Sequence, residues 1–240
     1  MGSIEKLTLY SLILLLIWGN MVSGLGHGLA CPDWPLCFGS FLPGRQMNLQ
    51  VFLEWFHRLD AFLIGLALLL QLVLSIRWRA HLPPWMPYAS CFLVFLVSLQ
   101  GGLGALTVVN LLPSSVVTAH LAIGLILVAS LSALSQRLLV MDAAPAPVWW
   151  PLMGGTSVLF VIFQCLIGGR MATSWAAQRC LSNDQACNLL SLHRVSAIPV
   201  TFLILVFVGM AFVRGGWPRT QWPLLLSVLF LVFTQISLGL

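Results

Sequence analysis

The stretch Glu-Trp-Phe-His-Arg at residues 54–58, with Asp60 just beyond it, places four ionisable side chains inside a long apolar run. A run of this length is typical of a membrane-spanning helix, where ionisable groups are costly and are kept mostly where they face protein, a ligand or water. On a helix, the side chains of Glu54, His57 and Arg58 share roughly one face. The stretch therefore predicts either a functional site or an internal Glu54–Arg58 ion pair beside a core histidine.

The composition of the 240-residue chain is that of a membrane protein. Hydrophobic residues make up 60% of the chain and charged residues 7%, whereas about a quarter of the residues in a soluble domain are charged. The 11 lysines and arginines outnumber the 6 acidic residues, but they are scattered at the ends of apolar runs, a pattern that reports membrane topology and not nucleic-acid binding. The sequence therefore predicts an all-α, polytopic membrane protein that contacts lipid and no nucleic acid.

Seven apolar runs are long enough to cross about 30 Å of hydrocarbon as helices. They cover residues 7–26, 52–76, 85–109, 115–136, 148–169, 189–213 and 223–240. Six lysines and arginines lie on one set of alternating connections and three on the other. Because cytoplasmic loops carry the excess of positive charge, the N-terminus is expected in the cytoplasm. The loops expected on the outer side are residues 27–50, 110–114 and 170–188.

An internal repeat divides the chain. The pair His57-Arg58 recurs as His193-Arg194, 136 residues later, and the glutamine, leucine and glycine of residues 100–104 recur at 235–239, 135 residues later. In each half, two cysteines precede the helix that carries the His-Arg pair. Such repeats are typical of membrane proteins built from two related halves.

The repeat predicts two pseudo-symmetric four-helix bundles, in residues 1–140 and 141–240. Seven transmembrane helices are expected, because the second half holds three apolar runs and its fourth helix would begin where the sequence stops. A counterpart of His120 is accordingly expected beyond Leu240.

Histidines at equal depth suggest a heme site. His57 lies about six residues into its predicted helix and His120 about five residues into its own, so both lie roughly 8 to 9 Å below the helix ends at about 1.5 Å per residue. Two such histidines in one bundle can bind a heme iron from both sides, and His193 lies at the same depth in the second half. The alternative is separate core histidines bonded to carbonyl groups. A zinc or copper site is less favoured, because only Glu54 could complete a tight ligand set.

Charged side chains beside the histidines add candidate roles. Arg58 and Arg194 each follow a candidate ligand at the outer end of a span, where a guanidinium could hold a heme propionate or act as an interfacial anchor. Glu54 has Leu190 as its counterpart, so the two halves differ chemically. A carboxylate beside a heme could act as a general base, carry protons or stabilise a developing cation. Asp60, one turn after the first histidine, could instead orient its imidazole.

Two cysteine pairs lie in loops expected outside the cytoplasm. Cys31 and Cys37 flank a Pro-Asp-Trp-Pro-Leu segment, and Cys180 and Cys187 flank six residues. Cysteines in an oxidising compartment normally form disulfides, so the pairs Cys31–Cys37 and Cys180–Cys187 are expected. Structural disulfides are favoured over redox-active ones, because neither pair has the Cys-x-x-Cys spacing of reactive thiols.

Together these features resemble the heme A synthase family of cytochrome oxidase assembly proteins. The resemblance covers nearly the whole chain, and it is carried by the repeat and by Gly-Leu-Ala-Cys-Pro-Asp-Trp-Pro-Leu-Cys at residues 28–37, Glu54-x-x-His57-Arg58, residues 100–104 and His120. It implies an integral protein of the bacterial cytoplasmic (inner) membrane with two pseudo-symmetric four-helix bundles. It also implies oxidation of the C8 methyl group of heme O to a formyl group, which gives heme A for cytochrome oxidase.

The resemblance further implies a division of labour between the halves. The N-terminal half, with Glu54 as catalytic residue and His57 and His120 as iron ligands, is expected to bind the substrate heme O. The C-terminal half is expected to bind a heme b cofactor at His193. Heme O synthase and cytochrome oxidase assembly factors are the implied partners. The alternatives are a b-type membrane cytochrome that relays electrons and a non-catalytic heme carrier.

Overall fold

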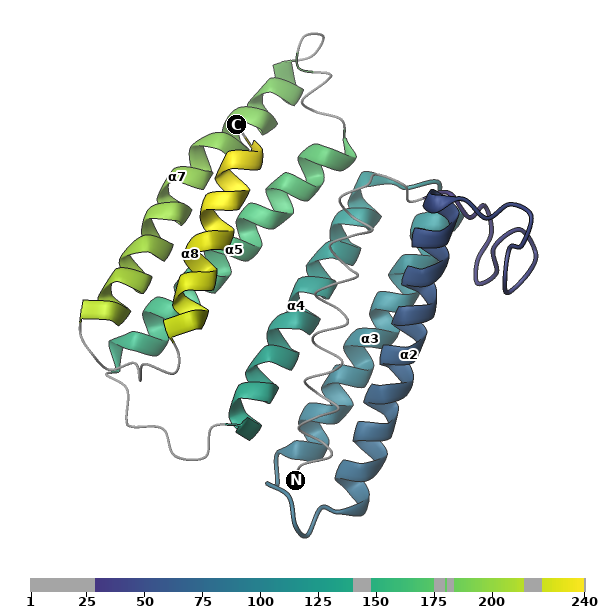
Figure 1. Cartoon of the computed structure of the whole chain (residues 1–240), viewed down its shortest axis with the longest axis horizontal. Coiled ribbons are helices and arrows are strands. Elements are labelled where there is room, and N and C mark those ends of the chain that lie inside the picture. The colour runs from purple at the N-terminus through teal and green to yellow at the C-terminus, as the bar shows by residue number, and fades with distance from the viewer. Residues whose placement is uncertain (1–28, 140–147, 175–179, 181–183, 214–221, 240) are drawn as a thin grey trace. The chain divides into compact units, whose positions relative to one another are not determined.

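The computed structural model describes residues 29–139, 148–174, 180, 184–213 and 222–239. This part of the chain is helical, with no strand beyond a single bridge between Cys37 and Ser40. Its helices, shown in Figure 1, are α2 (Leu49–Arg77), α3 (Met86–Val109), α4 (Ser114–Leu139), α5 (Trp149–Thr173), α7 (Asp184–Val213) and α8 (Trp222–Gly239). The predicted all-α class is therefore confirmed.

The described helices match six of the predicted spans. Of these, α2, α3, α4, α5 and α7 are long and apolar enough to cross a membrane, and α8 is a shorter apolar helix. The sixth span was predicted to start at residue 189, but α7 starts at Asp184, because the helix continues through polar residues ahead of the apolar run. The predicted span at residues 7–26 lies outside the described residues, so the count of seven helices stays a prediction.

Contacts divide the chain into two compact units, residues 1–141 and 142–240. In the first unit, α3 packs against both α2 and α4, and in the described part of the chain no Cα atom of α2 lies within 8 Å of one in α4. Buried aliphatic side chains of these three helices form its core: Ile64, Leu68, Met86, Leu93, Leu127 and Leu131. In the second unit, α7 packs against both α5 and α8, and its core includes Val208, Ala211 and Leu225.

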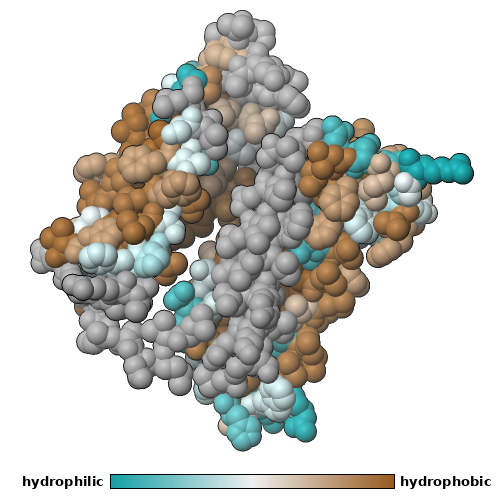
Figure 2. Space-filling view, in the orientation of Figure 1, coloured by the Kyte–Doolittle hydropathy of each residue, from teal (hydrophilic) through white to brown (hydrophobic). Residues whose placement is uncertain are grey.

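The surfaces of the helices are apolar in both units. Large hydrophobic side chains such as Phe62, Val73 and Phe230 are more than half exposed, and Figure 2 shows apolar residues spread widely over the helices. Soluble proteins rarely expose continuous apolar surface of this extent, whereas membrane lipid would cover it. The fold is that of an integral membrane protein.

Local signals set the helix ends that carry the candidate site. The side chain of Asn48 caps α2, because its Oδ1 accepts hydrogen bonds from the N–H groups of Gln50 and Val51, both at 3.0 Å. After α3, Leu111 and Leu112 adopt positive φ angles of 57° and 60°, which turns the chain sharply into α4. The N-termini of α2 and α4 therefore lie at the same end of the first unit (Figure 1).

Candidate functional site

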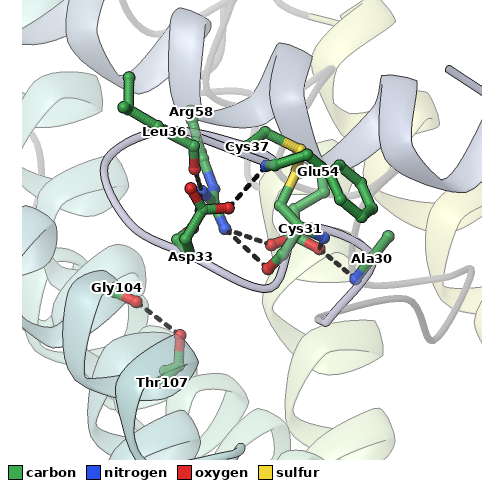
Figure 3. Close-up of polar contacts among 10 residues, drawn as sticks. Ala30, Cys31, Asp33, Leu36, Cys37, Glu54, Arg58, Gly104 and Thr107 are labelled. Atoms are coloured by element: carbon green, nitrogen blue, oxygen red, sulfur yellow. Dashed lines mark hydrogen bonds and ion pairs between the residues drawn. A yellow bond between two sulfur atoms is a disulfide. The ribbon is translucent and has the colours of Figure 1, made fainter. Parts of the chain in front are cut away.

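Glu54 is buried near the start of α2, where it binds the cysteine loop, defined here as residues 29–48. The residue is only 5% exposed. Its Oε2 accepts hydrogen bonds from the N–H groups of Ala30 at 2.7 Å and Cys31 at 3.1 Å, and its Oε1 accepts one from Arg58 at 2.6 Å (Figure 3). A carboxylate offers about four acceptor positions, so Oε1 keeps a position for a further partner.

The guanidinium of Arg58 binds the same loop. Its Nη1 donates to the carbonyl oxygens of Asp33 and Leu36, both at 2.6 Å, and its Nη2 donates to Glu54 and, at 3.4 Å, to the carbonyl oxygen of Cys31. Within the described part of the chain, these contacts use both terminal nitrogens, which leaves the Nε–H group for another acceptor. The internal Glu54–Arg58 ion pair that the sequence allowed is present, and it ties the loop to the helix.

Both predicted cysteine pairs are bonded in the structure. Cys31–Cys37 has a Cα–Cα distance of 4.8 Å and Cys180–Cys187 one of 4.5 Å. Cys31 and Cys37 are 0% and 1% exposed, and the carboxylate of Asp33 accepts hydrogen bonds from two N–H groups within the loop. Burial of this pair, in a loop with so many internal bonds, favours a structural role.

The side chain of His120, on α4, contacts Gln100 on α3. Its Nε2 is 3.2 Å from the Nε2 atom of Gln100. In the described part of the chain, the Nδ1 of His120 and the Oε1 of Gln100 are buried without a hydrogen-bond partner. Because buried polar atoms are normally paired, two unpaired atoms on one contact indicate a place where a ligand could bind.

His57 lies on α2, one turn after Glu54 and in the same unit as His120. Both histidines lie within the first three turns of their helices, α2 and α4, whose N-termini lie at the same end of the first unit (Figure 1).

His193 lies in the second unit, on α7, against α5. The Nε2 of Gln164 is 3.1 Å from its Nδ1 and donates to its carbonyl oxygen at 2.8 Å. The Oε1 of Gln164 accepts a hydrogen bond from Ser196 at 2.6 Å. Arg194, predicted to meet a propionate, is exposed.

One expected contact is missing. Asp60 was considered as a residue that orients His57, but it is 5% exposed and makes no hydrogen bond with that histidine. Although residues three positions apart are neighbours on a helix surface, the structure has no hydrogen bond between these two side chains. In the described residues, no three histidine, cysteine or acidic side chains converge as they would around a tightly bound metal ion.

Sequence reasoning missed the two glutamines that contact the histidines. Gln100 was noted only as part of the repeat, and Gln164 was not noted. A signal was present in both cases, since each glutamine is followed four residues later by a glycine, Gly104 or Gly168, and residues four apart share one helix face.

Known proteins match this chain over most of its length. Residues 6–240 match the family model COX15-CtaA, described as "Cytochrome oxidase assembly protein". The heme A synthase of Shouchella clausii (strain KSM-K16) is 29% identical over 220 residues, which are 83% of this chain and 72% of that protein. The heme A synthases of Bacillus pumilus (strain SAFR-032) and Geobacillus thermodenitrificans are each 34% identical, over 67% and 61% of this chain. These matches span 52% and 46% of the two relatives, about half of their length.

Proposed function

The chain belongs to the cytochrome oxidase assembly protein family that the COX15-CtaA model describes, and from this premise we propose that it is a heme A synthase. The proposed reaction is oxidation of the C8 methyl group of heme O to a formyl group. The names of its relatives support this activity, and the membrane-spanning character of the helices suits a substrate as apolar as heme O.

The observation that carries the proposal is the position of Glu54. Its carboxylate is buried, one turn from His57, in the unit that also contains His120, and its Oε1 has an acceptor position left after binding Arg58. A buried carboxylate beside two histidines is not required for electron relay alone. It is what an enzyme needs to accept a proton or to stabilise positive charge on a reacting carbon.

Two helices of the first unit that do not pack against one another carry its candidate histidines. In the described residues, α2 and α4 remain more than 8 Å apart at their Cα atoms because both pack on α3. His57 and His120 come from these two separated helices. We assign them to the iron of heme O, in the N-terminal half of residues 1–140.

Conversion of a methyl to a formyl group with oxygen from water releases protons and electrons. In this proposal Glu54 takes a proton or stabilises the carbon as electrons leave, and the hydrogen bonds from Arg58 and the amides of Ala30 and Cys31 support it by keeping the carboxylate in position. A heme b in the C-terminal half, residues 141–240, would accept those electrons one at a time and pass them to an external oxidant.

The second unit has a donor set that fits such a cofactor. Gln164 contacts the Nδ1 of His193, so Nε2 is the nitrogen left for iron. Arg194 is exposed next to this histidine and can reach a propionate. Arg58 can offer a propionate its Nε–H group while keeping its loop contacts.

The test is the heme content of a bacterial membrane that makes heme O but no heme A of its own. Expression of the full chain should yield heme A on chromatography of extracted heme, and Glu54→Ala should leave heme O. Asp33→Ala is the matched control, because it removes hydrogen bonds within the cysteine loop without touching Glu54. Equal heme A from the wild-type and Glu54→Ala proteins would remove this carboxylate from the chemistry.

The same experiment separates the rival functions. A b-type cytochrome would show a reducible low-spin spectrum and release only heme b. A heme carrier would release heme O unchanged, even with Glu54 intact.

A further inference from the structure

In both units, a glutamine from one helix contacts the imidazole of a histidine on the next described helix. Gln100 on α3 contacts His120 on α4 at 3.2 Å, and Gln164 on α5 contacts His193 on α7 at 3.1 Å. The two units share no residues, so the contact occurs twice independently. Gln100 has no part in the proposed function, and Gln164 enters it only as the hydrogen-bond partner of His193.

Glycines make room for each of these contacts. A Cβ atom on Gly104 would lie 3.3 Å from the Cε1 of His120, and one on Gly168 would lie 2.9 Å from the Cε1 of His193. The first contact is reciprocal, since a Cβ on Gly124, four residues after its histidine, would lie 3.1 Å from the Nε2 of Gln100. Each imidazole therefore packs against the backbone of a glycine, and any side chain at that glycine would come too close to the ring.

The hydrogen bonds of Gln164 also select a tautomer for the ring of His193. The amide of Gln164 has a defined orientation, because its Nε2 donates to the carbonyl oxygen of His193 and its Oε1 accepts from Ser196. It therefore donates to Nδ1, and the neutral ring carries its proton on Nε2. For Gln100 no second hydrogen bond within the described residues defines the amide orientation, so its contact with the Nε2 of His120 holds the ring whichever of the two groups donates the proton.

We propose that Gln100 and Gln164 are positioning residues that fix the ring orientations of His120 and His193, and that Gln164 also sets the tautomer of the free His193 ring. The identity of the ligand that those rings meet, a heme, rests on the proposed function. Groups that hydrogen-bond to a ligand histidine orient it and commonly change affinity at the metal by about 10- to 100-fold.

A glutamine suits this position because its amide has both a donor and an acceptor. While the ring is free, the amide N–H donates to one ring nitrogen. When the other nitrogen gives its lone pair to iron, the first must carry the proton, and the amide can turn to accept it. For Gln100 both amide orientations are open within the described residues, since its Oε1 has no partner there, whereas a turn of Gln164 breaks its hydrogen bonds to the carbonyl oxygen of His193 and to Ser196.

The direct test is the protonation of the rings in the heme-free full chain. With only five histidines in the sequence, ¹⁵N-histidine NMR of protein in lipid nanodiscs can follow each ring. His193 is expected in the Nε2–H form. Gln100→Glu should hold His120 in the Nε2–H form and shift its ring signals, because a carboxylate only accepts. Unchanged His120 signals in this variant would overturn the proposal.

Gln71→Leu is the matched control. Gln71 is a fully buried glutamine on α2 that hydrogen-bonds to Ser90, and it lies about four helical turns beyond His57, so its loss should leave the histidine signals unchanged. If Gln71→Leu and Gln100→Leu change them alike, a general packing effect explains the result and the positioning role is refuted.

The second test uses hemin as the probe. Gln100→Leu and Gln164→Leu should each weaken one phase of low-spin hemin binding by about 10- to 100-fold, while Gln71→Leu should not. Equal binding by all three variants would contradict the proposal. Failure of the wild-type chain to bind hemin would instead count against the proposed function, and the NMR result would still decide the role of the glutamines.

Discussion

Gly168→Ala is the change whose effect follows most directly from the structure. The new Cβ would lie 2.9 Å from the Cε1 of His193, whereas carbon atoms pack best at about 3.5 to 4.0 Å. The ring must move by roughly 0.6 Å or more, but it is held by Gln164 through Nδ1. We expect that hydrogen bond to break.

The size of the effect can be estimated against a control on the same helix. Crowding of a packed site costs about 1 to 3 kcal/mol, and loss of the Gln164–His193 hydrogen bond adds about 1 kcal/mol. Gly155→Ala has no atom within 4 Å of its new Cβ. Both variants gain about 1 kcal/mol of helix propensity, so Gly168→Ala should be about 2 to 4 kcal/mol less stable than Gly155→Ala.

The assay is unfolding of the purified chain in mixed micelles by SDS titration, followed by circular dichroism, with His193 observed by ¹⁵N NMR. Each 1.4 kcal/mol corresponds to about a tenfold change in the equilibrium constant, so the expected difference is readily measured. The reasoning is refuted if Gly168→Ala and Gly155→Ala unfold at the same SDS concentration and the His193 signals of Gly168→Ala are unchanged. Gly168 would then not be needed for the imidazole to pack against α5.

Three further predictions concern the cysteine loop and the helix that holds it. Arg58→Lys should destabilise the chain by on the order of 3 kcal/mol in the same titration, because one ammonium group cannot reach all the acceptors that the guanidinium binds. Arg194→Lys, at an exposed position, should leave the stability nearly unchanged. Cys31 and Cys37 should resist reductant and maleimide in the folded protein and be labelled only after unfolding, since both are buried; labelling in the folded state would contradict a structural role. Asn48→Ala should cost about 1 kcal/mol through loss of the α2 cap, and an unchanged SDS midpoint would show that the cap contributes nothing.

The helices were predictable because membrane insertion imposes a simple pattern on the sequence. About 20 consecutive apolar residues are needed to cross the hydrocarbon, and each described helix coincides with such a run. The histidines were predictable for a related reason, since an ionisable residue within a run is conspicuous. Their depth follows from counting residues along a helix of fixed rise.

The partners of Glu54 were only partly predictable. Arg58 lies four residues away on the same helix, which is a local relation. The amides of Ala30 and Cys31 come from an irregular loop more than twenty residues earlier, and irregular backbone has no periodicity from which its contacts can be read. The sequence therefore indicated a charged cluster at this end of α2 without showing that the cluster holds the loop.

The glutamine–histidine contacts occur in both units, although the two histidines involved do not occupy equivalent positions in the internal repeat. The repeat aligns His193 with His57, yet the structure gives His193 the kind of glutamine contact seen at His120. What the two contacts share is their position. Gln100 lies nine residues before the end of α3 and Gln164 nine residues before the end of α5, which is roughly 13 Å along each helix.

Consecutive membrane helices run antiparallel, so the last turns of one helix lie beside the first turns of the next. A glutamine at that depth can therefore reach a histidine one to three turns into the following helix, and a glycine one turn further along allows the ring to approach the backbone. The contact is thus a consequence of helix order and depth. By the same reasoning, exchanging Gln100 and Leu103 should abolish the contact with His120 while preserving composition, because positions three apart do not present their side chains at the same height on the helix. A His120 tautomer unaffected by this exchange would show that depth does not govern the pairing.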